Sequence, residues 1–202
     1  MNFIVHIGTH KTGSSALQKF LYENRAALLK KGFLYPQKGI KGKAHHQLAL
    51  AMRERNQIAL KEILIGIKKE ADFYGVNKII LSSEGFEYIE NRDFFKTVFE
   101  KGLQIVLFIR RQDNYIESEY NQHVKMYGLR YTKDIYQFYF RYPFESRLNY
   151  KHVCNAWRAV LNGKCIHVIN YDNSASKHSG IFEGFLSQIG IDWDDDFIIP
   201  DS

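Results

Sequence analysis

The segment GTHKTGSS, residues 8–15, combines residue types that can hold an anion. Gly8 and Gly13 have the spacing of the phosphate-binding loop of nucleotide triphosphatases, G-x-x-x-x-G-K. The lysine is displaced, however, because Lys11 precedes the second glycine by two positions. An apolar run precedes the loop and a helical pattern follows it, so backbone N–H groups and the helix dipole would face a ligand. The alternative is an ordinary turn with a serine N-cap.

Two more sets of polar residues follow later apolar runs. Glu84 follows IILSS, and Arg110 follows IVLFI, with Ser118 eight positions farther on. Arginine presents a planar, permanently charged fork that suits phosphate, and a hydroxyl early in the next helix lies where the dipole favours an anion. This spacing also occurs by chance, and Arg111 is placed to compete for the role. The case for a phosphate site at Arg110 and Ser118 is stronger because the same sequence contains the unusual loop at residues 8–15.

The position of Lys11 separates two kinds of transferase. In a kinase or ATPase the lysine follows the second glycine, and an aspartate that ends another strand helps to hold Mg²⁺. Here the two later apolar runs end in Glu84 and in arginine, so the metal-holding half of that machinery is missing from the pattern. A transferable group with a single charge needs less metal, so a sulfuryl group fits better than a terminal phosphoryl group.

The loop resembles the 5′-phosphosulfate loop of sulfotransferases that use 3′-phosphoadenosine 5′-phosphosulfate (PAPS). The residues that match it are Lys11, Thr12, Gly13, Ser14 and Ser15. His10 stands where that family commonly has proline or arginine. The family also binds the 3′-phosphate of PAPS with an arginine at a strand end and a serine eight residues later, which match Arg110 and Ser118. The asparagine and proline that often follow this arginine are absent here, and the similarity extends from Ile4 to Ile191.

The resemblance implies a reaction and a role for each residue. The chain would transfer a sulfuryl group from PAPS to a hydroxyl or amine of a carbohydrate or glycolipid, without a metal ion. Lys11 would stabilise charge on the bridging oxygen, the loop would hold the 5′-phosphate, and Arg110 with Ser118 would hold the 3′-phosphate. Many relatives continue with a basic segment that covers the cofactor, so residues 1–202 are expected to be a compact or shortened form without it.

An acceptor hydroxyl must lose its proton during transfer, and the sequence offers several bases. Glu84 is preferred, because glycan sulfotransferases often use a glutamate at a comparable strand end. Otherwise Glu84 pairs with Lys11 or Arg110 and only orders the site. His46 is the reserve base, since other sulfotransferases use histidine, and His10 lies in the loop itself. Residues 115–131, rich in tyrosine, either line an acceptor groove or form an amphipathic helix with tyrosines toward the core.

Apolar runs alternate with helical patterns along the whole chain, which predicts an α/β fold in three layers around a mostly parallel sheet. The expected strands are residues 3–7, 78–84, 104–111 and 164–172, with a short extended piece at 33–36. The expected helices are residues 14–31, 45–70, 94–102, 115–126, 133–140, 150–161 and 180–190. In such folds ligands bind at the carboxyl ends of the strands, where all the residues above are expected.

Composition sets broad limits on this interpretation. The 202 residues predict one domain, and the net charge of +6 favours anionic partners, although solvated lysines explain it equally well. The first apolar run, residues 3–8, is too short for a secretory signal or a membrane span, so a cytoplasmic protein without membrane insertion is expected. Cys154 and Cys165 do not have a metal-binding spacing and are expected to be reduced, inert thiols.

Two other functions remain open from the sequence. A P-loop kinase acting on a small molecule is disfavoured by the displaced lysine and the missing strand-end aspartate. A basic module that binds polyanions without catalysis is also possible, and it would show a steep dependence on salt. No recognition helix or RNA-binding signature supports a nucleic-acid partner.

Overall fold

The computed structural model describes residues 1–89, 95, 98–99, 102–142, 144–161, 166–175 and 179–201. Within this part, five strands form one sheet in the order β2-β3-β1-β4-β5, and every neighbouring pair is parallel. The strands are β1 (Asn2–His6), β2 (Phe33–Leu34), β3 (Lys78–Ser82), β4 (Leu103–Ile109) and β5 (Ile166–Asn170). The predicted α/β class with a mostly parallel central sheet is therefore confirmed.

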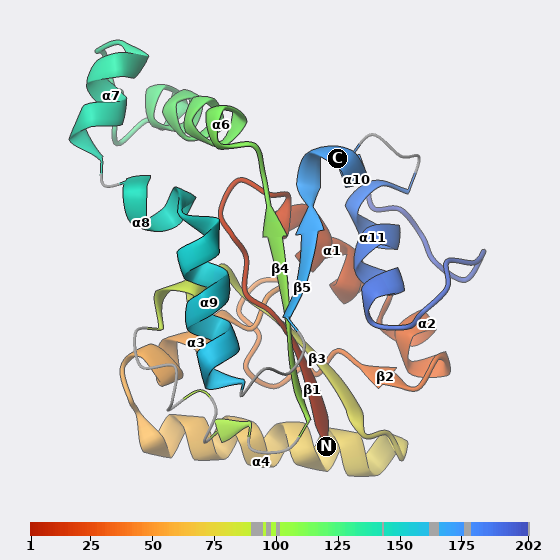
Figure 1. The fold of residues 1–202 in the computed structure, drawn as a ribbon. Coiled ribbons are helices and arrows are strands. Elements are labelled where there is room, and N and C mark those ends of the chain that lie inside the picture. The colour runs from red at the N-terminus through yellow and green to blue at the C-terminus, as the bar shows by residue number, and fades with distance from the viewer. Residues whose placement is uncertain are drawn as a thin grey trace.

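Helices cover both faces of the sheet (Figure 1). On one face lie α1 (Ser14–Glu23), α2 (Arg25–Lys30) and α11 (Gly180–Gln188). On the other lie α3 (His46–Arg53), α4 (Gln57–Tyr74) and α9 (Tyr150–Val160). Phe3 and Val5 pack toward the second group, whereas Ile4 packs toward the first. Side chains alternate along a strand, so a strand buried on both faces is mostly apolar, and the buried polar residues His6 and Ser82 lie at the ends of β1 and β3.

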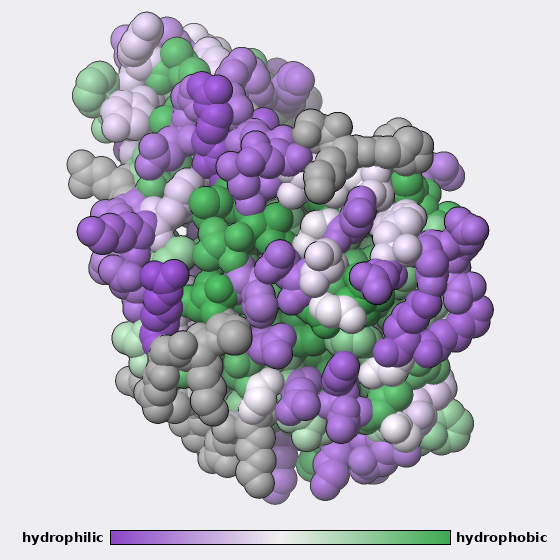
Figure 2. All heavy atoms as spheres, turned by 45° about the vertical axis from the view of Figure 1, so that its right-hand side comes forward, coloured by the Kyte–Doolittle hydropathy of each residue, from purple (hydrophilic) through white to green (hydrophobic). Residues whose placement is uncertain are grey.

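Three further helices form a lobe beyond the carboxyl ends of the strands (Figure 1). They are α6 (Gln112–Lys125), α7 (Ile135–Arg141) and α8 (Phe144–Leu148). The lobe has a small core of its own, made of Tyr115, Phe138, Phe144 and Leu148. Figure 2 shows the lobe as a projection above the body, with hydrophobic and hydrophilic side chains mixed on its surface. Its position brings the lobe against the edge of the sheet where ligands bind in α/β folds.

Two predicted helices are each divided in two. The helix expected over 14–31 breaks at Asn24, whose amide group donates to the carbonyls of Phe20 and Ile198 and so ties the break to the C-terminal segment. The helix expected over 45–70 breaks at residues 54–56, and Asn56 caps the new helix by accepting from the N–H of Ala59. Gly66 lies buried within α4.

Strand ends also differ from the prediction. β3 stops at Ser82, so Glu84 begins a short 3-10 helix, η1 (Glu84–Tyr88), instead of ending the strand. β4 stops at Ile109, which leaves Arg110 just beyond the strand. The run expected over 164–172 becomes β5 followed by the short helix α10 (Tyr171–Ala175). Cys165 and most of the helix expected over 94–102 lie outside the described residues.

Two further findings bear on the expectations from composition. The Cys154 thiol is free and buried, and burial raises its pKa. Among the described helices, none combines the length and the apolar character that a membrane crossing requires.

Candidate functional site

The predicted site residues gather around the carboxyl end of β1. This strand lies between β3 and β4. The chain passes from β1 to β2 and β3 on one side and then crosses to β4 and β5 on the other, and a crevice forms at such a point in an α/β sheet. The loop at residues 7–13 follows β1, η1 follows β3, and Arg110 follows β4. The prediction that three distant segments meet at one edge of the sheet is confirmed.

The loop after β1 has the backbone shape of an anion site. Gly8, Lys11 and Gly13 have φ angles of 98°, 62° and 73°, and α1 begins directly after Gly13. No side chain caps the first N–H groups of α1, which leaves them available to a ligand. A Cβ atom at Gly13 would lie 2.7 Å from Ile181 Cδ1 and 2.9 Å from Tyr171 Cε2. Glycine is therefore required here both by conformation and by close packing.

The hydroxyl groups of the loop differ in what they contact. Thr12 Oγ1 donates to the carbonyl of Thr9 at 2.6 Å, and Ser14 Oγ donates to the same carbonyl at 3.0 Å. A hydroxyl has one proton to donate, so in this structure these two protons shape the loop. Both side chains are buried, whereas Ser15 is exposed at the first turn of α1.

Lys11 ties the loop to the lobe and to β4. Its ammonium group donates to Gln122 Oε1 of α6. Its carbonyl accepts from Arg110 Nη1 at 3.1 Å. Within the described chain, no ion pair joins Glu84 to Lys11 or to Arg110, so the alternative role expected for Glu84 has no direct contact behind it.

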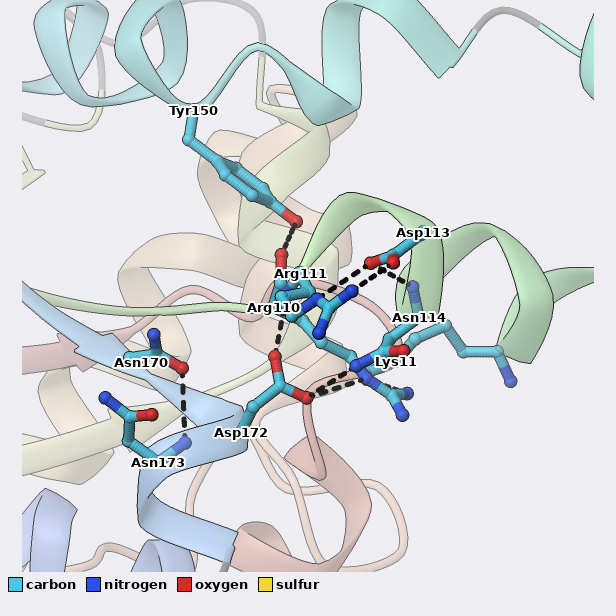
Figure 3. A network of polar contacts seen from close by, with 9 residues as sticks. All are labelled: Lys11, Arg110, Arg111, Asp113, Asn114, Tyr150, Asn170, Asp172 and Asn173. Carbon is cyan, nitrogen blue, oxygen red and sulfur yellow. Dashed lines mark hydrogen bonds and ion pairs between the residues drawn. The ribbon is translucent and has the colours of Figure 1, made fainter.

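Asp172 of α10 holds the segment around Arg110 in place (Figure 3). Its Oδ1 lies 3.6 Å from Arg110 Nε and accepts from Asn114 Nδ2 at 3.2 Å. Its Oδ2 accepts from the backbone N–H of Arg111 at 2.8 Å. Tyr150 adds a hydrogen bond of 2.8 Å from its hydroxyl to the Arg110 carbonyl. One carboxylate thus fixes the junction between β4 and α6 from the end of β5.

Arg110 and Arg111 are distinguished by their surroundings. The Arg111 side chain forms an exposed ion pair with Asp113 at 2.5 Å and points away from the crevice. The Arg110 side chain is 22% exposed and lies against the ring of Tyr171, with 5.2 Å between its guanidinium carbon and the ring centre. Arg110 is therefore the arginine that faces the crevice.

A cavity of about 720 Å³ lies between the loop and α6. Its charged lining consists of Lys11, Arg110 and Lys125 against one acid, Glu117, and Ser118 also lines it. The volume falls in the range typical of sites for small molecules and cofactors. The excess of cations favours an anionic ligand. We call this space the larger cavity.

A second cavity of about 290 Å³ lies on the other side of Gln122, whose side chain lines both. We call it the smaller cavity. Its walls carry the aromatic rings of Tyr88, Tyr142 and Phe144 together with His10, Arg147 and further polar side chains of α6. His10 and Lys11 are consecutive in sequence, and each lines a different cavity.

Two titratable groups near the smaller cavity have displaced pKa values. Burial lowers the pKa of His10; Glu84 and Glu119 raise it in part, while Arg147 and Lys11 lower it further. Burial raises the pKa of Glu87 to about 7. The Glu87 carboxylate accepts from the backbone N–H of His10, and its buried Oε2 has no hydrogen-bond partner among the described residues.

Comparison with known proteins extends this description. A crystal structure described as a sulfotransferase from Alicyclobacillus acidocaldarius matches with a TM-score of 0.56 over 99% of this chain and 83% of that chain. The chain shares its fold with a sulfotransferase. The two sequences are 13% identical, so the match speaks to the fold. No protein-family model and no curated protein sequence matches the chain.

The structure places the two bases expected from sequence outside both cavities. Glu84 lies at the start of η1, and neither it nor His46 is among the described residues that line the two spaces. His46 Nδ1 lies 2.8 Å from Ser83 Oγ, which caps η1. His45 is fully buried, with Nδ1 accepting from the Ser82 N–H, so Nε2–H donates to the Pro36 carbonyl.

Several residues of this site were missed by reasoning from sequence. Asp172 follows an apolar run as Glu84 and Arg110 do, so its place after a strand was a usable signal. Glu87 and Arg147 carried no such signal, because η1 and α8 were not predicted and each residue reaches the site only through the tertiary fold.

Proposed function

We propose that this chain is a sulfotransferase that moves a sulfuryl group from PAPS to a carbohydrate or glycolipid acceptor. The observation that carries the proposal is the larger cavity, which combines Lys11 of a helix-N-terminal loop with Arg110 and Ser118. The donor carries a phosphosulfate and a separate 3′-phosphate, and the cavity offers cationic groups from two segments to match them. The shared fold with a sulfotransferase supports the same assignment.

Each half of the donor has a proposed partner. Backbone N–H groups at the start of α1, with the exposed Ser15 hydroxyl, receive the 5′-phosphate. Arg110 and Ser118 receive the 3′-phosphate, since a guanidinium group binds a phosphate through paired, charge-assisted hydrogen bonds. Thr12 and Ser14 keep the loop in shape through the Thr9 carbonyl.

The proposed chemistry is a direct, in-line transfer. The acceptor oxygen forms a bond to sulfur while the bond from sulfur to the bridging phosphate oxygen breaks, and adenosine 3′,5′-bisphosphate leaves. Lys11 stabilises the charge that develops on that oxygen, after exchanging its contact with Gln122 for the leaving group. Lys11, Arg110 and Lys125 together meet the charges of the donor, so we propose that the reaction proceeds without a metal ion.

A small-molecule kinase is the second proposal from the same cavity, because the loop binds a phosphate in either enzyme. Kinases of this loop type hold Mg²⁺ with an aspartate at a strand end. Asp172 occupies such a position after β5, but its carboxylate is already engaged by Arg110, Asn114 and the Arg111 backbone. This engagement favours the sulfotransferase.

The experiment that tests the proposal is calorimetric titration with adenosine 3′,5′-bisphosphate, AMP and ATP·Mg²⁺. We expect micromolar binding of the bisphosphate and much weaker binding of AMP, because AMP lacks the 3′-phosphate that Arg110 and Ser118 would hold. Tight binding of ATP·Mg²⁺ with none of the bisphosphate would support the kinase instead. Binding only of heparin, lost steeply as salt rises, would support a polyanion-binding module.

A further inference from the structure

We propose, building on the sulfotransferase function above, that the smaller cavity is the acceptor site and that His10 takes the proton from the acceptor hydroxyl. The inference assigns a base that differs from both Glu84 and His46. It also assigns the chemical class of the acceptor group, namely a hydroxyl on a single sugar ring.

The first support is the position of His10 between donor and acceptor spaces. Lys11 lines the larger cavity and His10, its neighbour in the chain, lines the smaller one. Gln122 contributes to both walls and accepts a hydrogen bond from Lys11. A sulfuryl group carried on the donor at Lys11 therefore lies at the boundary of the smaller cavity, where transfer requires the acceptor oxygen.

The second support is the free hydrogen-bonding capacity of His10. Its Nε2 is buried and has no hydrogen-bond partner among the described residues. The ring lies against Tyr88, with 5.5 Å between the ring centres, and Glu87 accepts from the His10 backbone N–H. A buried nitrogen without a partner is costly, and a hydroxyl that donates to it removes that cost.

The charged groups around His10 keep it in the form that a base needs. Burial lowers the pKa of His10, Arg147 and Lys11 lower it further, and Glu84 and Glu119 oppose them without reversing the shift. Its pKa therefore lies below the ordinary 6.5, and the imidazole is neutral at neutral pH. A neutral imidazole accepts a proton from a hydroxyl as the oxygen–sulfur bond forms.

The walls of the smaller cavity indicate the class of acceptor. Tyr88, Tyr142 and Phe144 line the cavity, and aromatic rings suit the C–H face of a sugar ring, while tyrosine hydroxyls can add hydrogen bonds. Arg147, which donates to the Tyr88 hydroxyl at 3.3 Å, adds donors for ring or hydroxyl oxygens. The volume of about 290 Å³ suits one sugar ring, with the rest of a larger glycan outside.

The proposed step balances as follows. The acceptor oxygen bonds to sulfur, its proton passes to His10 Nε2, and the bridging oxygen leaves with the electron pair of the broken sulfur–oxygen bond. Lys11 stabilises that oxygen, and His10 returns its proton to water after the products leave.

The test measures transfer of label from ³⁵S-PAPS to the methyl glycosides of glucose, galactose and N-acetylglucosamine. We expect His10→Gln to lower turnover about a hundredfold or more, the range for loss of a general base. We expect imidazole in the buffer to restore part of the turnover of His10→Ala, a result that a purely structural role would not give. His46→Gln, outside both cavities, should stay within about threefold of the wild type, and Glu84→Gln should lose far less turnover than His10→Gln.

Two further readouts make the outcome decisive. The His10 variants should bind adenosine 3′,5′-bisphosphate as the wild type does, and turnover should fall in acid with an apparent pKa below 6.5 that His10→Gln abolishes. Full activity of His10→Gln, or a loss confined to Glu84→Gln, would overturn the base assignment. Bisphosphate binding with no transfer to any glycoside would overturn the acceptor class, whereas no bisphosphate binding would overturn the proposed function itself.

Discussion

The two cavities meet at Gln122 but differ in nearly every other respect. The larger cavity is dominated by cations, and Lys11 and Arg110 are held by the loop carbonyl, Gln122 and Asp172. The smaller cavity is lined by aromatic rings and carries His10, whose Nε2 has no partner among the described residues. The cations of the larger cavity are held in place by neighbouring groups, although Arg110 Nε, like His10 Nε2, has no hydrogen-bond partner among the described residues.

This difference suits the two roles that we propose, with the donor bound in the larger cavity and the acceptor in the smaller one. In the proposed reaction the donor is the same molecule in every turnover, so its charges can be matched by preorganised cations. In the proposed division, the acceptor is recognised by shape, by ring stacking and by the buried His10 Nε2, whose missing hydrogen bond the acceptor hydroxyl would supply. The proposal requires cations held in place in the larger cavity and a buried nitrogen, His10 Nε2, that is free to accept a proton in the smaller one.

The largest effect should come from the cation that both proposals place at the boundary. Lys11→Ala should lower turnover roughly a hundredfold to a thousandfold, because it removes the group that stabilises the leaving oxygen. Turnover of ³⁵S-PAPS measures this, with exposed Lys41→Ala as the matched control. Turnover of Lys11→Ala within a few-fold of the wild type would break the assignment of the leaving group to this residue.

The burial of Glu87, near the smaller cavity, can be tested through the stability of the protein. Burial raises the pKa of Glu87 to about 7, so between pH 4.5 and 7 the folded chain binds more protons than the unfolded chain. Stability from this group is full below pH 4.5 and is lost as pH rises through 7. Glu87→Gln should therefore be more stable than the wild type at pH 8, by roughly 3 kcal/mol, with no difference near pH 4.5.

Urea unfolding at pH 4.5 and pH 8 measures the Glu87 effect. Glu62→Gln, on the exposed side of α4, should show no difference from the wild type at either pH. An equal stability of Glu87→Gln and the wild type at pH 8 would mean that this carboxylate is not desolvated.

The anion-binding role of the larger cavity can be tested with two neighbouring arginines. Arg110→Ala should weaken binding of adenosine 3′,5′-bisphosphate by roughly tenfold to a hundredfold, because a charged hydrogen-bonding partner of the 3′-phosphate is lost. Arg111→Ala is the matched control, since its side chain pairs with exposed Asp113, and its affinity should stay within about twofold. Equal effects of the two variants in calorimetry would remove Arg110 from the site.

The loop itself should show the smallest effect, on stability. Gly13→Ala forces a side chain into a backbone with φ of 73° and against Ile181 and Tyr171, so the free energy of unfolding should fall by roughly 1–3 kcal/mol. Gly128→Ala, in open space, should change it by less than about 0.5 kcal/mol. A Gly13→Ala protein as stable as the wild type in urea would show that the loop is looser than described.

The sequence predicted several residues that line the larger cavity, but it did not predict the lining of the smaller cavity. Lys11 and Arg110 follow strands, so local pattern and parallel-strand topology place them together, and Ser118 lies in the middle of the helix that follows Arg110. Tyr88, Tyr142 and Arg147 come from three segments with no shared spacing, and packing of the lobe alone brings them to one wall. His10 was visible in the loop, but its separation from Lys11 into another cavity depends on the left-handed backbone at residue 11.

The predicted ends of helices and strands were wrong where tertiary contacts outweighed the local sequence pattern. The break at Asn24 depends on the carbonyl of Ile198, which lies far along the chain. The early end of β3 at Ser82 depends on Ser83, which caps η1 and also contacts His46. That early end moved Glu84 out of the position from which its role as base was inferred.

The most direct test of the account is a crystal structure with adenosine 3′,5′-bisphosphate. We expect the 5′-phosphate against the N–H groups at the start of α1 and the 3′-phosphate within hydrogen-bonding distance of Arg110 and Ser118. We also expect the nucleotide to leave the smaller cavity beside His10 free. A bisphosphate whose phosphates lie in the smaller cavity, or away from both Lys11 and Arg110, would contradict the division into donor and acceptor sides.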